Sequence, residues 1–163
     1  MDKHIIIING TGGAGKDTFV NFCAEEEKVL NVSTVDKVKE AAKILVGWNG
    51  EKDEVSRKLL VDLKQLSIAY NDAPTKYILE MAEKFNESDD KFMFIHIREA
   101  EEIEKTKKLL NAKTLLISNP RVKLITSNNS DGQVNQYQYD YYIDNDGTLE
   151  ELKDKAICFM KEL

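Results

Sequence analysis

The chain has 163 residues and a mass of 18.6 kDa, which is the size of one domain. Hydrophobic residues make up 42% and charged residues 32%, so a core can form under a solvated surface and wholesale disorder is excluded. The formal net charge of −6 argues against a nucleic-acid partner, which requires a basic surface.

The two cysteines, Cys23 and Cys158, form neither a disulfide framework nor a Cys-x-x-Cys site. This usage is typical of a reducing compartment, and we expect a cytoplasmic protein. No apolar run approaches the ~20 residues that span a membrane, and the first residues lack the basic segment of a signal peptide. We therefore expect no membrane partner.

Five short apolar segments are predicted strands. The first is a β-branched run that ends at a glycine, which is typical of the buried central strand of a parallel sheet. In chain order the predicted strands cover residues 4–9, 29–32, 92–97, 113–118 and 141–144.

Six segments with apolar residues at helical spacing are predicted helices. They cover residues 16–28, 33–46, 51–70, 71–86, 99–110 and 148–163. The longest is amphipathic and carries Val55, Leu59, Leu60, Leu63 and Leu66. Because strands alternate with helices, the sequence predicts an α/β domain with a parallel sheet and helices on both faces. The polar stretch 119–139 has the length of a lid or a binding loop.

A glycine-rich loop lies between the first predicted strand and the first helix. Residues 10–16 read Gly-Thr-Gly-Gly-Ala-Gly-Lys and match the G-x-x-x-x-G-K pattern. Phosphate oxygens need several backbone N–H groups at once, and glycines permit the positive φ values and close approach that this requires. The next helix offers its N–H groups and the positive end of its dipole. The predicted phosphate-binding residues are Gly10, Gly12, Gly13, Ala14, Gly15, Lys16, Asp17 and Thr18.

Three side chains at the end of this loop have separate expected roles. Lys16 supplies a positive charge to the β- and γ-phosphates. Asp17 stands where serine or threonine usually ligates magnesium, so it either binds Mg²⁺ or simply favours the first turn of the helix. Thr18 is expected to hydrogen-bond the α-phosphate.

Asp36 follows the second predicted strand. With Ser33 three residues before it, Asp36 fits a capping box. Ligands of open α/β folds bind at the carboxyl edge of the sheet, so Asp36 can instead face Lys16. There it would hold a Mg²⁺-bound water or accept the proton of an attacking oxygen. Both interpretations stay open.

Arginine occurs only three times, so each position is a candidate for binding phosphate with a planar fork. Arg57 either pairs with Asp53 four residues earlier or binds an acceptor phosphate. Arg98 ends the third predicted strand and faces the phosphate loop. Arg121, with Lys123, opens the polar stretch, from which cations can reach a transferring phosphoryl group.

Two further positions are candidates for binding a base. The turn between the last strand and the last helix contains Asn145 and Gly147, whose backbone either contacts a nucleotide base or serves only as turn and cap. Trp48, the only tryptophan, either stacks on a base or anchors the core, and we favour the core.

Several segments resemble one enzyme family. Residues 10–18 resemble the P-loop of nucleoside monophosphate kinases, and the Gly-Lys-Asp-Thr ending is similar to that of phage-type deoxynucleoside monophosphate kinases. Residues 94–98, followed by Glu102, are similar to an arginine-plus-glutamate signature of the phage-type group. Residues 142–152 resemble the final strand and helix of those kinases and of dephospho-CoA kinases.

The resemblance implies a three-layer P-loop kinase fold in a single domain over residues 1–163. It implies a five-stranded parallel sheet, an acceptor-binding helical insert at about 34–86 and a lid at about 119–139. It also implies ATP with Mg²⁺ as phosphoryl donor and a phosphorylated acceptor. Arg57 and Arg98 would hold the acceptor or the transferring group.

Three functions are therefore in contention. The leading hypothesis is phosphoryl transfer from ATP to a nucleoside or deoxynucleoside monophosphate. The alternatives are a kinase of another small phosphorylated metabolite, of phosphomevalonate or dephospho-CoA type, and a non-catalytic ATP-binding module. The expected catalytic residues are Lys16, Asp17, Asp36, Arg98 and Arg121. The partners would be small-molecule nucleotides, and the protein would be a monomer or a homodimer.

Overall fold

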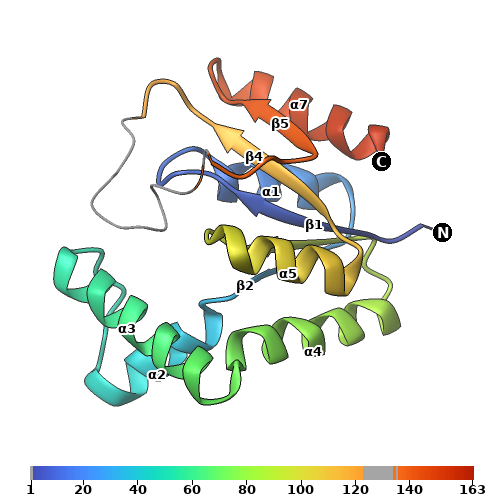
Figure 1. Cartoon of the computed structure of the whole chain (residues 1–163). Helices are drawn as coiled ribbons and strands as arrows, with labels where there is room; N and C mark the ends of the chain where they lie inside the picture. Colours follow the sequence, from blue (N-terminus) through green and yellow to red (C-terminus); the bar gives the residue numbers. More distant parts are fainter. Residues whose placement is uncertain (1, 123–133, 135) are drawn as a thin grey trace.

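A computed structural model of the chain describes residues 2–122, 134 and 136–163 (Figure 1). Its five strands are parallel and lie in the order β2-β3-β1-β4-β5, so β1 is central. The strands are β1 (His4–Asn9), β2 (Val29–Ser33), β3 (Phe92–His96), β4 (Lys113–Ser118) and β5 (Tyr141–Asp144). All five predicted strands are confirmed, as is the α/β architecture with a parallel sheet.

Helices cover both faces of the sheet. They are α1 (Lys16–Glu26), α2 (Asp36–Val46), α3 (Glu54–Asn71), α4 (Ala73–Glu87), α5 (Ala100–Leu110) and α7 (Leu149–Glu162). The six predicted helices are confirmed, with ends displaced by a few residues. None of the helices within the described ranges is long and apolar enough to cross a membrane.

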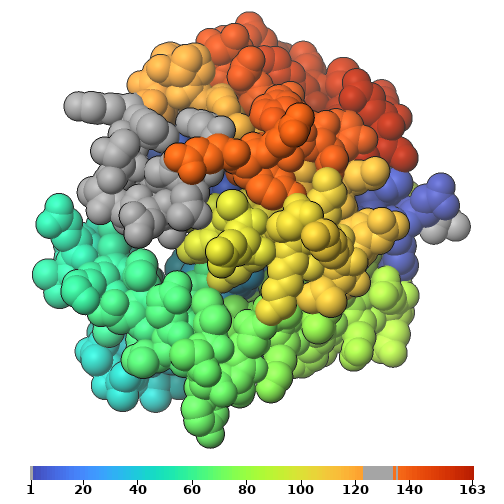
Figure 2. All heavy atoms as spheres, viewed as in Figure 1, coloured from blue at the N-terminus to red at the C-terminus, as the bar shows by residue number. Residues whose placement is uncertain are grey.

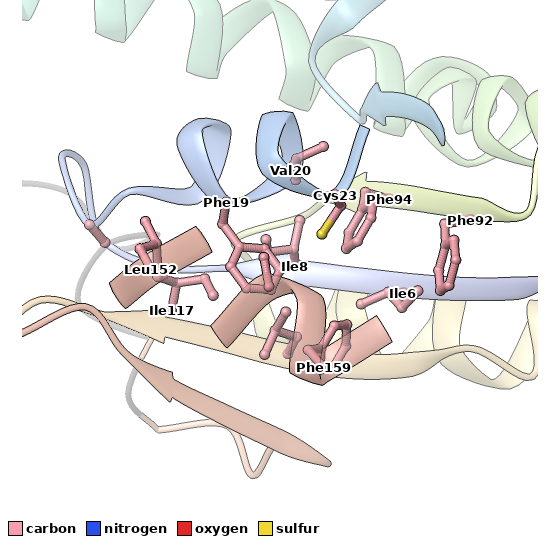
Figure 3. Close-up of a cluster of buried hydrophobic side chains, with 13 residues drawn as sticks. Ile6, Ile8, Phe19, Val20, Cys23, Phe92, Phe94, Ile117, Leu152 and Phe159 are labelled. Atoms are coloured by element: carbon pink, nitrogen blue, oxygen red, sulfur yellow. The ribbon is translucent and has the colours of Figure 1, made fainter. Parts of the chain in front are cut away.

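Each face of the sheet carries its own hydrophobic cluster, because successive strand residues point to opposite sides. Ile6, Ile8 and Phe94 face α1 and α7, where they meet Phe19 and Phe159 (Figure 3). The alternate strand residues face α4 and α5, and the second cluster includes Ile7, Met93, Ile95, Phe85 and Ile103. Burial on both faces explains why the strands read as continuous apolar runs.

Helix α3 leaves some of its apolar residues exposed. Its buried residues are Ser56 and Lys64, whereas Val55 is 81% exposed and Leu66 is 67% exposed. Among the described elements α3 packs mainly on α2 and α4, away from the sheet, and therefore has no layer to cover its full apolar face (Figure 1).

The turn after α2 differs from its prediction. Gly47 has a φ of +67° and ends the helix. Trp48 is half-buried, belongs to neither hydrophobic cluster, and donates its indole N–H to the Glu51 carbonyl oxygen at 3.0 Å. The preference for Trp48 as a core residue was therefore wrong.

The two cysteines should react very differently. Cys23 is fully buried against the sheet, and burial raises the pKa of its thiol to about 12, whereas Cys158 is exposed. Because the thiolate is the reactive form, we expect an aromatic disulfide reagent at pH 8 to titrate one thiol in the native protein. Two thiols should react after denaturation in urea. Rapid reaction of both in the native state would contradict the burial of Cys23.

Candidate nucleotide-binding site

The glycine-rich loop between β1 and α1 has the geometry of an anion site. Gly13 and Gly15 have φ values of +79° and +102°, which side-chain-bearing residues rarely adopt. A Cβ on Gly15 would lie 2.5 Å from Asn145 Nδ2. Helix α1 begins at Lys16 with no side chain capping its first turn, so its N–H groups are open to a ligand. These features fit the phosphates of a nucleotide.

Lys16 and Asp17 lie at the start of α1. The Lys16 ammonium group donates to the carbonyl oxygen of Gly10, so the side chain folds back over the loop. Asp17 is exposed in the first turn, and Thr18 beside it is half-buried. All three residues therefore lie where the phosphate loop meets the first turn of α1.

Asp36 begins α2 at the carboxyl end of β2. Its Oδ2 accepts hydrogen bonds from the Ser33 backbone N–H at 2.8 Å and from the Tyr77 hydroxyl at 3.0 Å. Helix α2 begins only at Asp36, with Val35 before it and no side chain capping its start, so the capping box predicted for Ser33 and Asp36 is not formed. Asp36 is therefore held by these two bonds as the first residue of the helix. Burial, together with the neighbouring Asp36 carboxylate, raises the pKa of Tyr77 to about 12, so this hydroxyl keeps its proton at neutral pH.

His96 ends β3 between the phosphate loop and Asp36. The pKa of its imidazole is lowered to about 4, mainly by burial. The charge of Lys16 contributes to this lowering, whereas the carboxylates of Asp17 and Asp36 oppose it. The ring is therefore neutral at pH 7, and its Nε2 lies 2.8 Å from Asn31 Oδ1. These charges act on one imidazole because the parallel strands bring Lys16, Asp17 and Asp36 to the same edge of the sheet.

The end of β1 contains a residue that the sequence analysis missed. Asn9 is fully buried, and its Oδ1 accepts from the Gly10 N–H at 2.8 Å. Its Nδ2 donates to the Tyr139 hydroxyl at 2.9 Å and to the Arg98 carbonyl oxygen at 3.2 Å. One amide therefore joins the phosphate loop, the end of β3 and the chain before β5. An asparagine at the end of an isoleucine run, directly before the glycines, was the available signal.

The turn between β5 and α7 contacts the phosphate loop, as its predicted position requires. Asn145 donates from Nδ2 to the Ala14 carbonyl oxygen at 3.0 Å. Arg121 Nη2 donates to the Gly147 carbonyl oxygen at 3.0 Å. Next to these contacts is a cavity of about 350 Å³, whose lining includes Thr11, Asn119, Val122, Asp144 and Asp146. Arg121 therefore lies beside the turn predicted to contact the base.

The other two arginines lie on α3 and directly after β3. Arg57 is exposed near the start of α3, where Asp53 caps the helix by accepting from the Ser56 N–H at 2.7 Å. Arg98 follows β3, and Asn9 holds its carbonyl oxygen. Lys123, the other cation predicted in the polar stretch, lies outside the described residues.

Solved structures share this fold, and two of the three described next are kinases. TT1252 of Thermus thermophilus has 20% identity over 100% of this chain and 99% of its own, with a TM-score of 0.56. The dephospho-CoA kinase of Campylobacter jejuni has 16% identity over 98% and 97%, with a TM-score of 0.54. A shikimate kinase of Acinetobacter baumannii, in complex with shikimate, has 14% identity over 99% and 94%, with a TM-score of 0.52.

These likenesses extend over nearly the whole chain in each case. The five-stranded parallel sheet with helices on both faces is therefore the fold of P-loop kinases, as predicted. The sequence itself matches no protein-family model and no curated protein.

The hydroxyl of Tyr139 should contribute measurably to stability. Tyr139 is 5% exposed, and its hydroxyl also donates to the Val134 carbonyl oxygen at 2.8 Å. Tyr139→Phe leaves a buried Asn9 N–H and the Val134 carbonyl oxygen without this partner, so urea denaturation should show a loss of ~1–3 kcal/mol.

Tyr142→Phe is the matched control. The Tyr142 hydroxyl accepts from the Tyr139 N–H, but Tyr142 is 58% exposed, so water can replace it. We expect a loss below about 0.5 kcal/mol for this surface substitution. Equal losses in the two variants would contradict the importance of the buried network.

Proposed function

We propose that the protein is an ATP-dependent phosphotransferase that phosphorylates a small acceptor, a nucleoside or deoxynucleoside monophosphate. The observation that carries the proposal is the phosphate loop. Its two glycines with positive φ, the uncapped start of α1 and Lys16 occur together at the central strand of a kinase fold. A non-catalytic nucleotide-binding module would not need a carboxylate such as Asp36 held by two hydrogen bonds at the same edge of the sheet.

Magnesium would depend largely on the nucleotide itself. No three His, Cys, Asp or Glu side chains cluster as a metal site within the described ranges. Mg²⁺ commonly keeps several waters and binds one or two carboxylates with substrate phosphates, which suits a site with few protein ligands. Asp17 fits as the carboxylate, directly or through water. When bound, the ion would neutralise charge on the β- and γ-phosphates.

Asp36 is suited to the acceptor side. Both of its described hydrogen bonds use Oδ2, so Oδ1 can accept a bond from water or from a hydroxyl group of the bound acceptor. The two donors fix the orientation of the carboxylate. Catalysis in this class is mostly positioning and electrostatic stabilisation, so one oriented carboxylate and several cations suffice.

Arg57 and Arg98 are proposed to bind the phosphate that the acceptor already carries. A monophosphate brings a dianion close to the γ-phosphate of ATP, and cations must offset the repulsion. A guanidinium can grip two phosphate oxygens where an ammonium cannot. Arg121, which contacts the β5–α7 turn, is assigned to the donor nucleotide and the transferring group. Asn145 and Gly147 border the nucleotide in this proposal.

A second acceptor class has its own support. The chain shares its fold with a dephospho-CoA kinase over 98% of its length, and the phosphate loop does not depend on the acceptor. A small phosphorylated metabolite that is not a nucleotide is therefore the alternative. Both classes carry phosphate groups, which the two arginines are suited to bind.

An acceptor panel with Mg-ATP tests the proposed function. Release of ADP should rise with one or more nucleoside monophosphates and stay low with dephospho-CoA and phosphomevalonate. Lys16→Ala should abolish transfer while circular dichroism shows an intact fold, because its charge is needed most in the transition state. Unchanged turnover in folded Lys16→Ala would remove the loop from the mechanism. Tight ATP binding without any turnover would favour the non-catalytic module.

Replacing the two arginines by lysine separates acceptor from donor. We expect Arg57→Lys and Arg98→Lys each to impair acceptor use by at least ~1–2 kcal/mol, near the worth of a charge-assisted hydrogen bond. ATP affinity without acceptor should change much less. Arg121→Lys is the comparison variant, and its larger effect should fall on ATP. Wild-type acceptor kinetics in both lysine variants would show that the acceptor site lies elsewhere.

A further inference from the structure

Lys64 is a buried cation on a helix that is otherwise mostly accessible. It is 4% exposed, whereas Val61 and Leu66 on the same helix are 46% and 67% exposed. Its ammonium group donates to Glu99 Oε2 at 2.9 Å and to Glu102 Oε2 at 3.0 Å. The two carboxylate side chains are 26% and 19% exposed. The three groups therefore form an ion triad between α3 and the start of α5.

The triad holds α3 in one position relative to the start of α5. A buried ammonium is costly unless it is paired, and removing one member leaves an uncompensated charge. Burial raises the pKa of Glu102, whereas Lys64 acts in the opposite direction, so the carboxylate depends on the cation for its charged state. A rotation or translation of α3 would separate Lys64 from both partners. Apolar packing on α2 and α4 is less directional and does not fix the helix in this way.

Lys64 is also linked to the two arginines assigned to the acceptor. Arg57 lies seven residues earlier on α3, which is about two helical turns, so both side chains emerge from the same side of the helix. Glu99 directly follows Arg98, whose carbonyl oxygen is held by Asn9. The triad thus connects the helix that carries Arg57 to the turn that carries Arg98. Figure 2 shows a hollow beside α3, between that helix and the body of the molecule.

We propose that Lys64 is a positioning residue, which fixes α3 against Glu99 and Glu102 so that Arg57 and Arg98 act on the same acceptor. This inference rests on the proposed function. Lys64 itself does not contact the acceptor. Its ammonium group is paired with the two carboxylates. Its contribution is to orient α3.

Kinetics provide the first test. Lys64→Met should raise the KM for the acceptor about tenfold or more, since misplacement by about 1 Å can cost up to 100-fold. ATP affinity in the absence of acceptor should stay within about twofold, because the phosphate loop lies on another element. Lys58→Met is the matched control, since Lys58 pairs with Asp62 on the same helix and is 75% exposed. It should leave both quantities unchanged.

Direct measurement of the helix position provides the second test and needs no acceptor. Spin labels are placed on the native Cys158 and on Val55→Cys, both exposed, while Cys23 stays buried. Pulsed electron spin resonance then measures the distance distribution from α3 to α7. Lys64→Met should broaden or shift this distribution, and Lys58→Met should not. The result stands whether or not any acceptor in the panel is phosphorylated.

If Lys64→Met alone does not fold, the same distance is measured in the triple variant Lys64→Met, Glu99→Gln, Glu102→Gln. It removes all three charges, so no buried charge lacks a partner, and it should fold with a broadened distribution. An unchanged distribution in a folded Lys64 variant would overturn the proposal. So would a raised acceptor KM without any change in distance, because Lys64 would then act on the acceptor itself. A parallel loss of ATP affinity would also overturn it.

Discussion

The parallel sheet brings the carboxyl ends of all its strands to one edge, and every proposed role depends on that constraint. Strand β1 is central, so the phosphate loop that follows it has neighbours on both sides. Asp36 and His96 arrive from the side of β2 and β3, and Asn145 from the side of β5. Residues more than 130 positions apart, Ala14 and Asn145, therefore share a hydrogen bond. Without this common edge none of the separate motifs would form a site.

The parts of the molecule that local pattern determines were predictable from the sequence. The isoleucine run of β1 and the apolar run of β3 identify strands because they are buried on both faces. The glycine loop was also predictable, since Gly13 and Gly15 satisfy a backbone requirement that few residues meet. The capping box predicted at Ser33 was wrong, because the helix begins three residues later, at Asp36.

The remaining features depend on which elements meet in space. Periodicity assigns Leu66 to an apolar face but cannot show that α3 lies away from the sheet. Nothing in the sequence around Lys64 marks it as buried, because its two partners are 35 and 38 residues away in the chain. Asn9 likewise donates a buried hydrogen bond to Tyr139, which is 130 residues away in the chain. The burial of a polar group by partners far away in the chain cannot be predicted from the residues next to it in the sequence.

The neutral imidazole of His96 has a consequence for the protein in acid. In the unfolded chain this ring takes up a proton near pH 6.5, whereas in the folded protein it does so only near pH 4. Between these values the unfolded state binds more protons, so the contribution of His96 to folding stability declines as the pH falls. Above about pH 6.5 the ring is neutral in both states and adds no pH dependence. A single half-buried ring at the sheet edge thus makes the protein less stable in acid, while the ring itself stays uncharged at neutral pH.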